Sequence, residues 1–493
     1  MENYQKLKVI ENQISLISSI KSVLSWDHQC NMPALGANYR GDQMAYLSSL
    51  THKLLTCEDY KITLEKAEQE ALQLNKTSHE AAHLNLSRKR YEKIKSLPEE
   101  LVKQISKAKV LTQKSWEAAV QAKNFKILEK DLTKLVSLTK EKCKLINSSK
   151  REYDLLLDEF EPGVTSNELD HIFAKLLPKL KDILKDILNN KKFTEKFSLK
   201  HCPIQTQKTL CMNLSTKLGY HSDIMRISTS SHPFSATLGL KDYRITTRYD
   251  ERNFISSFLA TAHEMGHSLY EQGLPIQYKS LPIGQAASYG VHESQSLFWE
   301  KRVVSSKEFL QEWFGQFSPF FNTKISDNDN LYKVFNHVSP GLIRVDSDEV
   351  TYCLHIIIRY EIEKKIFSNS LEVKDIPQMW NDLYNQYLGL LPQNDAEGCL
   401  QDIHWACGSF GYFPSYALGH LISSQFTATL EKAHGPISDL IKEQKLDLVK
   451  NWLKENVYLK GSLHKPFDLV KFVSNSFLDE TYFTGYLEKK YGL

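Results

Sequence analysis

The chain has 493 residues, of which 41% are hydrophobic and 25% are charged. These proportions are typical of soluble globular proteins, and the length allows about two to four domains. A formal net charge of +3 is too small to indicate a nucleic-acid or membrane-surface partner.

Glycine and proline are scarce, with 20 and 15 residues, which indicates few turns and predicts a mainly helical fold. The first residues lack the apolar centre of a signal peptide, and no run of about 18 apolar residues follows. The eight cysteines are scattered without Cys-x-x-Cys spacing, which is typical of reduced, buried thiols that bind no metal. We therefore expect a cytoplasmic protein.

Residues 1–160 show the apolar periodicity of successive long helices. The stretch Ser25-Trp-Asp-His-Gln-Cys-Asn-Met-Pro33 interrupts this pattern, and the lysine-rich part between 85 and 150 is typical of a solvated helix face. At Glu161-Pro-Gly163 the pattern breaks, and Thr165 with Glu168 forms a predicted capping box for a new helix. A subdomain boundary near 161–165 is possible, but no linker or repeat is present, so we expect one catalytic domain over residues 1–493.

Residues 223–249 have the alternation of β-strands. The predicted strands cover Ile224 to Thr229, Ser231 to Phe234 and Asp242 to Tyr249. An exposed strand edge can hold an extended peptide by main-chain hydrogen bonds. A purely structural hairpin is equally compatible with the pattern.

A helix is predicted next, with Asp250 as its cap and with Gly273 and Pro275 at its end. It carries the motif His263-Glu-x-x-His267, which places two imidazoles on one face, where both can reach one metal ion. Its apolar stripe lies about 150° around the helix axis from the two histidines. We therefore expect the apolar side to face a core and the histidine side to face a cleft. The alternative is a chance pattern with both histidines in an ordinary core.

A catalytic zinc site usually has a third protein ligand and one open position. Position 270 is Tyr and position 273 is Gly, which excludes the metzincin pattern. A second helix, predicted to start near His292, offers Glu293 as the best-placed ligand. Glu271 is too close along the first helix to complete a tetrahedron, and Glu300 is a candidate for orienting a ligand histidine.

Residues 305–385 return to helix, interrupted by a turn between Ser339 and Tyr352 that contains Arg344. This guanidinium could bind a substrate carboxylate, or it could pair with Asp346 or Asp348. The stretch Gly398–Gly419 combines four glycines and five aromatic residues with Gln401, Asp402 and His404, which indicates close backbone approach to another group.

Together these motifs resemble the Taq-type (thermostable) zinc metallocarboxypeptidases, a family of His-Glu-x-x-His peptidases with glutamate as third ligand. The matching segments are Trp26-Asp27 with Met32-Pro33, His232-Pro-Phe234, Asp242-x-Arg244-x-Thr246, His263-Glu-x-x-His267, His292-Glu-Ser-Gln295, Ile343-Arg-x-x-Ser-Asp348, Gly398-x-x-Gln-Asp-x-His-Trp405 and Gly411-Tyr-Phe-Pro-Ser-Tyr416. They run in family order through most of the chain. The family usually has Ala where this chain has Ser347.

The resemblance implies that His263, His267 and Glu293 bind Zn²⁺ and that Glu264 is the general base. It further implies a large helical peptidase fold with a deep central groove, a small β-sheet next to the zinc-binding helix, and a homodimer. It implies that His232 and Arg344 hold the substrate and that residues 398–416, which include His404, line the groove.

We therefore predict release of single C-terminal amino acids, with broad specificity, from peptides with a free carboxylate. Arg344 is the first choice for binding that carboxylate, with Arg244 and Arg248 in reserve, and Tyr412 or Tyr416 is expected to stabilise the oxyanion. Co²⁺ or Mn²⁺ could replace zinc. The alternatives are a related helical oligopeptidase or dipeptidyl carboxypeptidase, or a metal-binding scaffold without catalysis. No nucleic-acid or membrane partner is expected.

Overall fold

The computed structural model describes residues 1–75, 78–195, 197–322 and 325–493. Within these ranges the chain forms twenty α-helices and one three-stranded sheet. The predicted fold class, mainly helical with a small sheet, is confirmed. Among the described residues, no helix has the length and apolar character needed to cross a membrane.

Successive helices fill the first 160 residues, as predicted, and the described part of this range contains seven of them. They are α1 (Glu2–Cys30), α2 (Ala37–Thr56), α3 (Glu58–Glu70), α4 (His79–Lys95), α5 (Glu99–Ala122), α6 (Lys126–Asn147) and α7 (Glu152–Leu157). The interruption predicted over residues 25–33 is present but begins later than its first residue, because α1 continues to Cys30 and α2 begins at Ala37. Trp26 is buried in this last part of α1, and its ring packs against that of Phe234, so tertiary contact extends the helix beyond its local apolar pattern.

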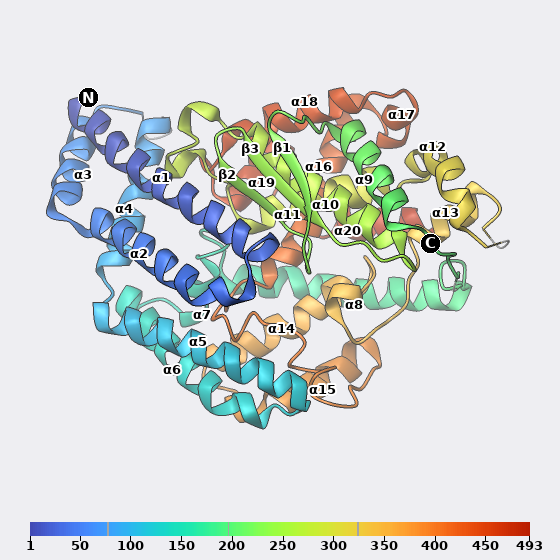
Figure 1. Cartoon of the computed structure of the whole chain (residues 1–493), viewed down its shortest axis with the longest axis horizontal. Helices are drawn as coiled ribbons and strands as arrows, with labels where there is room; N and C mark the ends of the chain where they lie inside the picture. The colour runs from blue at the N-terminus through green and yellow to red at the C-terminus, as the bar shows by residue number, and fades with distance from the viewer. Residues whose placement is uncertain (76–77, 196, 323–324) are drawn as a thin grey trace.

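Helices α1 to α4 enclose a small hydrophobic core of their own, separate from the main core. At its centre the buried Glu11 carboxylate accepts hydrogen bonds from Tyr60 and Ser87 and contacts the ring of His83. Toward the rest of the molecule, α1 lies against strand β2 (Ser235–Gly239), where the Ser19 hydroxyl donates to the carbonyl of Leu238. The four N-terminal helices lie together at the left of Figure 1.

The predicted break at residues 161–163 separates α7 from α8 (Ser166–Asn190). Gly163 has a φ of 86°, a left-handed conformation that favours glycine. The capping box of Thr165 and Glu168 is present in full. Because buried residues on both sides of the break, such as Leu156 and Leu169, belong to one core, the break is a turn within that core.

Helix α9 (Ile204–Leu218) leads into the sheet, which consists of β1 (Met225–Thr229), β2 and β3 (Asp242–Thr247) in the order β1-β3-β2. β1 runs parallel and β2 antiparallel to β3. The strand predicted over Ser231 to Phe234 is wrong, since these residues form the connection and β2 begins at Ser235. Pro233 lacks an amide hydrogen for a strand ladder, and the amide of Phe234 donates to the side chain of Thr246.

Two helices that pack against each other follow the sheet, α10 (Phe254–Gly273) and α11 (Tyr289–Leu297). α11 continues as a π-helical segment over Phe298–Val304. The others are α12 (Lys307–Phe317), α13 (Asn328–Phe335), α14 (Tyr352–Phe367), α15 (Ile376–Leu388), α16 (Pro414–His434), α17 (Ile437–Lys442), α18 (Leu446–Asn456), α19 (Pro466–Ser474) and α20 (Thr481–Tyr491). In Figure 1 the sheet, α10 and α11 lie in an upper tier, whereas α5, α6, α14 and α15 lie below them.

Candidate metal centre and active-site cavity

Helix α10 separates the core from a polar site. Its apolar side is buried through Phe254, Phe258, Ala262 and Met265, as the periodicity predicts. The predicted cap Asp250 is wrong, because Asn253 caps the helix by accepting a hydrogen bond from the amide of Ser256. The helix ends at Gly273 as expected.

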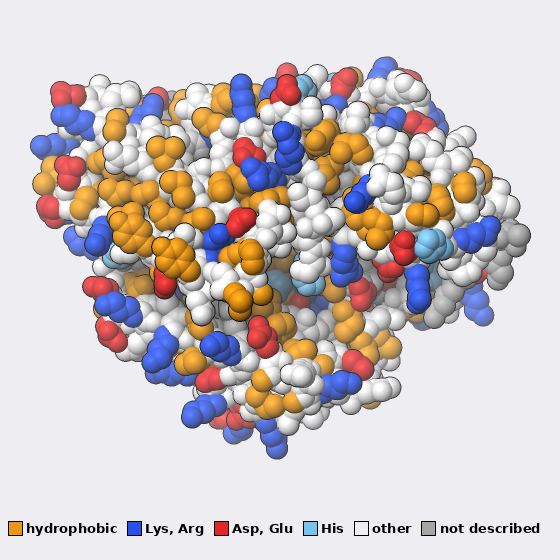
Figure 2. Space-filling view, in the orientation of Figure 1, with side chains coloured by type: hydrophobic (Ala, Val, Ile, Leu, Met, Phe, Trp, Pro, Cys, Tyr) orange, Lys and Arg blue, Asp and Glu red, His pale blue; other side chains and the backbone are white. Residues whose placement is uncertain are grey.

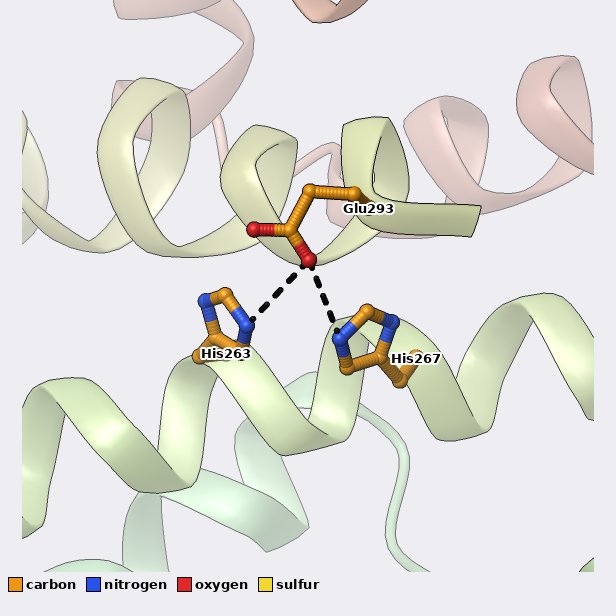
Figure 3. A group of neighbouring side chains, drawn as sticks. All are labelled: His263, His267 and Glu293. Atoms are coloured by element: carbon orange, nitrogen blue, oxygen red, sulfur yellow. Dashed lines mark ion pairs between the residues drawn. The ribbon is translucent and has the colours of Figure 1, made fainter. Parts of the chain in front are cut away.

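Figure 3 shows His263 and His267 on α10 and Glu293 on α11, with the three side chains pointing toward one another. Glu293 Oε2 lies 3.6 Å from His263 Nε2 and 3.4 Å from His267 Nε2. One ligand atom from each residue fits within a mutual separation of 4.8 Å. The structure therefore brings together the three side chains that the sequence predicts as metal ligands.

The approach of α11 to α10 depends on Gly266, which lies between the two histidines. A Cβ atom at this position would be 2.5 Å from the carbonyl oxygen of Gln295 and 2.6 Å from the Cα of Ser296. On the opposite side of α11, a Cβ atom on Gly419 of α16 would be 2.6 Å from Glu293 Cγ. Two glycines thus leave the space in which Glu293 reaches the histidines.

α11 begins at Tyr289, three residues before the predicted start, because the Ser288 side chain caps it by accepting from the amide of Val291. This brings His292 and Glu293 into the first turns of the helix. His292 contacts His267, with 2.7 Å between their Nδ1 atoms. On the other side of the cluster, His263 Nδ1 lies 2.9 Å from Glu300 Oε2, the partner that the sequence suggests.

The electrostatics of the cluster favour a bound cation. Burial opposes a positive charge on His263, but the nearby Glu293 and Glu300 carboxylates raise its pKa to about 10. Burial also opposes a negative charge on Glu293, yet His263 and His267 hold its pKa below the usual range. The carboxylates are therefore ionised at neutral pH and stabilise positive charge between them.

Glu264 lies beside the cluster and is almost fully buried. Burial raises the pKa of its carboxyl group to about 7, although His263 acts in the opposite direction. Its Oε2 atom is buried and has no hydrogen-bond partner within the described structure. Such a carboxylate is suited to exchange a proton near neutral pH.

The cluster lies in a cavity of about 1270 Å³, and Figure 2 shows a hollow near the centre of the face, with histidine side chains visible in it. Four of the predicted substrate-binding residues line this cavity: His232, Arg344, Tyr412 and Tyr416. The loop before β2 and the turn at residues 159–162 contribute further walls. The predicted deep groove next to the sheet is thus present as a large cavity.

Arg344 is buried at the cavity wall and has a partner that the sequence did not suggest. Its Nε and Nη2 atoms donate to one oxygen of Asp402 at 3.0 and 2.7 Å, and Nη1 donates to the Tyr352 hydroxyl at 2.8 Å. The second oxygen of Asp402 accepts from Arg359 Nε at 2.6 Å. Asp348 instead caps the turn before α14 through the amides of Val350 and Thr351.

Two of the predicted substrate contacts are not among the residues that line the cavity. Arg244 pairs with Asp242 at 2.9 Å, and its guanidinium lies over the ring of Trp26. His404 lies behind Tyr416, with its Nε2 atom 3.2 Å from the Tyr416 hydroxyl. Arg248, the other reserve arginine, is exposed and does line the cavity.

Sequence reasoning did not single out Tyr352, which lines the cavity and holds Arg344. It also gave no role to His292 and discarded Glu271, although these residues form a chain behind His267. The sequence signals for His292 were its position beside Glu293 and its place in the matching segment His292-Glu-Ser-Gln295. Nothing local in the sequence indicated that His292 and Glu271 would support the same site.

The residues present fit a zinc ion. Two imidazoles and one carboxylate form a common donor set of catalytic zinc sites. Both imidazoles have their Nδ1 atoms engaged by neighbouring groups and direct Nε2 toward Glu293, the arrangement expected when Nε2 binds a metal.

Comparison with known proteins supports a metal-binding site. The family model Carboxypeptidase Taq (M32) metallopeptidase matches residues 6–491. Carboxypeptidase 1 of Bacillus subtilis is 36% identical over 485 residues, which are 97% of this chain and 96% of the relative. Thermostable carboxypeptidase 1 of Thermus thermophilus is 35% identical over an alignment of 500 positions, which covers 99% of this chain and 98% of the relative.

Solved structures agree over the whole chain. The Pyrococcus furiosus carboxypeptidase, in a form described as Apo-Mg, has a TM-score of 0.95 and 32% identity, covering 100% of this chain and 99% of that chain. Trypanosoma cruzi metallocarboxypeptidase 1 has a TM-score of 0.94 and 31% identity with the same coverage. The resemblance inferred from the motifs is confirmed, and the chain belongs to the Taq (M32) family of metallocarboxypeptidases.

Proposed function

We propose that this metallocarboxypeptidase releases single amino acids from the C-terminus of peptides, with a zinc ion held by His263, His267 and Glu293. The observation that carries the proposal is the convergence of these three side chains in the cavity that also contains the buried guanidinium of Arg344. The metal-binding triad can act on the last peptide bond while the fixed guanidinium of Arg344 binds the terminal carboxylate. This pairing suits the removal of one C-terminal residue.

Zinc, when bound, lowers the pKa of water from 15.7 toward roughly 7 and polarises the scissile carbonyl. Glu264 takes the proton of the attacking water and delivers it to the leaving amine. Burial raises the pKa of its carboxyl group above the usual range, and a group that titrates closer to neutral pH suits both steps. Its buried Oε2, which has no partner in the described structure, is the atom that receives the proton.

Arg344 binds the terminal carboxylate of the peptide. Asp402 fixes the orientation of Arg344 and also pairs with Arg359. Because two guanidinium groups share this one carboxylate, an excess positive charge remains to bind the substrate. His232 and Arg248 contact the peptide from the loop and strand end beside the cavity, and Arg244 has a structural role through its pair with Asp242.

The hydroxyl group of Tyr416 stabilises the developing oxyanion, and Tyr412 shapes the cavity beside it. The two rings lie 5.0 Å apart, edge to face. His404 contacts the Tyr416 hydroxyl through Nε2, so His404 contributes to substrate binding only through Tyr416. One such donor typically contributes about 2.7 to 4 kcal/mol to transition-state stabilisation.

The test is a time course of decapeptide digestion followed by mass spectrometry, with the same peptide amidated at its C-terminus as control. We expect a ladder that loses one residue at a time from the free acid and slow cleavage of the amide. Internal fragments would identify an oligopeptidase, and losses of two residues would identify a dipeptidyl carboxypeptidase. Activity that survives exhaustive chelation would contradict the metal mechanism.

The metal is zinc, with Co²⁺ or Mn²⁺ as functional substitutes, because two imidazoles and one carboxylate suit all three ions. Metal analysis of protein purified without added metal tests this assignment. We expect about one zinc per chain, and a different metal at that ratio would replace zinc in the proposal.

We further propose that residues 1–493 act as one catalytic unit that assembles as a homodimer in the cytoplasm. Figure 2 shows hydrophobic side chains gathered over α1 and α2; those exposed by more than 40% are Val9, Leu16, Ile20, Val23, Leu35, Tyr39 and Tyr46. Such a patch is typical of an interaction surface. All eight cysteines are free, which suits a reducing compartment. Light scattering and cell fractionation test these two points.

A further inference from the structure

We propose that His292 is a positioning residue that fixes the tautomer and orientation of His267, and that Glu271 and Lys279 anchor it. This inference rests on the proposed role of His267 as a metal ligand. It gives a task to three polar residues that the proposed mechanism does not use.

The hydrogen-bond geometry determines the position of each proton. His292 Nδ1 and His267 Nδ1 are 2.7 Å apart, so one nitrogen carries the proton and the other accepts it. His267 directs Nε2 toward Glu293, at 3.4 Å from its Oε2, and must keep Nε2 unprotonated to bind a metal. Its proton therefore lies on Nδ1, and His292 Nδ1 is the acceptor.

The other ring nitrogen of His292 consequently carries a proton. His292 Nε2 lies 3.2 Å from Glu271 Oε1 and donates to it. Glu271 Oε2 in turn accepts from Lys279 Nζ at 2.7 Å and from the Thr237 hydroxyl at 3.0 Å. Each polar group from His267 to Lys279 then has one defined role as donor or acceptor.

Glu271 is suited to terminate this chain. Burial opposes its charge, but His292 and Lys279 hold its pKa well below the usual range, so it is ionised at neutral pH. Lys279 also donates to the backbone carbonyl of Glu271 at 2.8 Å, which binds the segment after α10 to the end of that helix. The anchor is therefore rigid and negatively charged.

The two imidazoles of the metal cluster are supported differently. His263 donates directly to the Glu300 carboxylate at 2.9 Å, whereas His267 donates to a neutral imidazole. A carboxylate increases the basicity of a ligand histidine more than a neutral acceptor does. Since His292 precedes Glu293 on α11, one helical turn supplies both a ligand and the group that orients another.

Three substitutions test the roles of the two ring nitrogens of His292 separately. His292→Asn keeps an acceptor at the position of Nδ1, His292→Gln keeps an amide at the position of Nε2, and His292→Phe keeps only the ring. We expect the Phe and Gln variants to bind zinc about 10- to 100-fold more weakly than the unmodified enzyme. The Asn variant should recover most of this loss, because it still accepts the proton of His267.

Zinc affinity is measured by competition with a chromophoric chelator, and circular dichroism verifies the helix content of each variant. His201→Asn is the matched control, since His201 is exposed and pairs with Glu251 at 3.4 Å, and its zinc affinity should be unchanged. If the Phe variant fails to fold, the comparison of Asn with Gln decides.

Equal zinc affinities of the Asn and Gln variants would overturn the inference, as would a Phe variant that binds zinc normally but has a raised KM. The latter result would make His292 a substrate contact. Failure of the unmodified enzyme to bind zinc would instead contradict the proposed function, so the two failures are distinguishable.

Discussion

Replacing Gly266 by alanine introduces a methyl group at the contact between α10 and α11. The new Cβ would lie 2.5 Å from the Gln295 carbonyl oxygen and 2.6 Å from the Ser296 Cα. Both atoms belong to backbone, so no side chain can rotate away. Extending the shorter contact to an ordinary 3.4 Å requires α11 to move by about 0.9 Å.

That displacement is large for a metal site, in which ligand distances hold to about 0.2 Å. Glu293 moves with α11 while His263 and His267 stay on α10. Weaker zinc binding is therefore expected, together with a loss of about 1 to 3 kcal/mol in the free energy of unfolding from overpacking. The loss of zinc affinity should exceed about tenfold, the lower end of the effect of disturbing the groups around a metal.

The assay combines chelator competition for zinc with denaturant unfolding of the metal-free protein. Gly315→Ala is the control, because Gly315 lies inside α12 and a Cβ there meets nothing within 4 Å. This variant should keep its zinc affinity and gain about 0.5 to 1 kcal/mol in stability. Normal zinc affinity in Gly266→Ala would refute the reasoning that contact between the helices sets the ligand geometry.

Three other substitutions test separate parts of the site. Glu264→Gln should retain zinc yet lower kcat by at least about a hundredfold, and near-normal turnover would exclude Glu264 as the base. Arg344→Lys should reduce the preference for free-acid over amidated peptides by about 10- to 100-fold through KM, since it removes a charge-assisted fork; an unchanged preference would assign the carboxylate to another cation. Burial raises the pKa of Glu161 to about 7, above its unfolded value, so its contribution to stability is present in full below about pH 4.5 and is lost as the pH rises through 7. The free energy of unfolding of Glu161→Gln, relative to that of the unmodified protein, should therefore rise by on the order of 1 to 3 kcal/mol as the pH is raised from 5 to 8. A difference that stays constant over that range in denaturant titrations would contradict the assigned pKa.

The sequence predicted those features that depend on local pattern. Apolar spacing gave α10 and its buried side, and the capping box gave the start of α8. The motif and the spacing to the next helix were enough to nominate His263, His267 and Glu293. Their roles as ligands, like the role of Glu264, stay predictions until the metal is measured.

Features that depend on distant residues were not predictable in this way. The partner of Arg344 is Asp402, 58 positions away, whereas the sequence suggested only the nearby Asp346 and Asp348. The pair of Arg244 with Asp242 was in principle visible, because residues two apart on a strand share a face. Trp26 extends α1 through contact with Phe234, which no local pattern reveals.

The separate small core of the N-terminal helices has a consequence for local stability. Its few buried side chains from α1 to α4 do not join the main core, and elements with few shared contacts open with less free energy than the whole molecule. Amide hydrogens of α3 and α4 should therefore exchange with solvent faster than those of α10 and α16. Since α1 also lies against β2, each such opening would loosen the support of the strand beside the catalytic cavity.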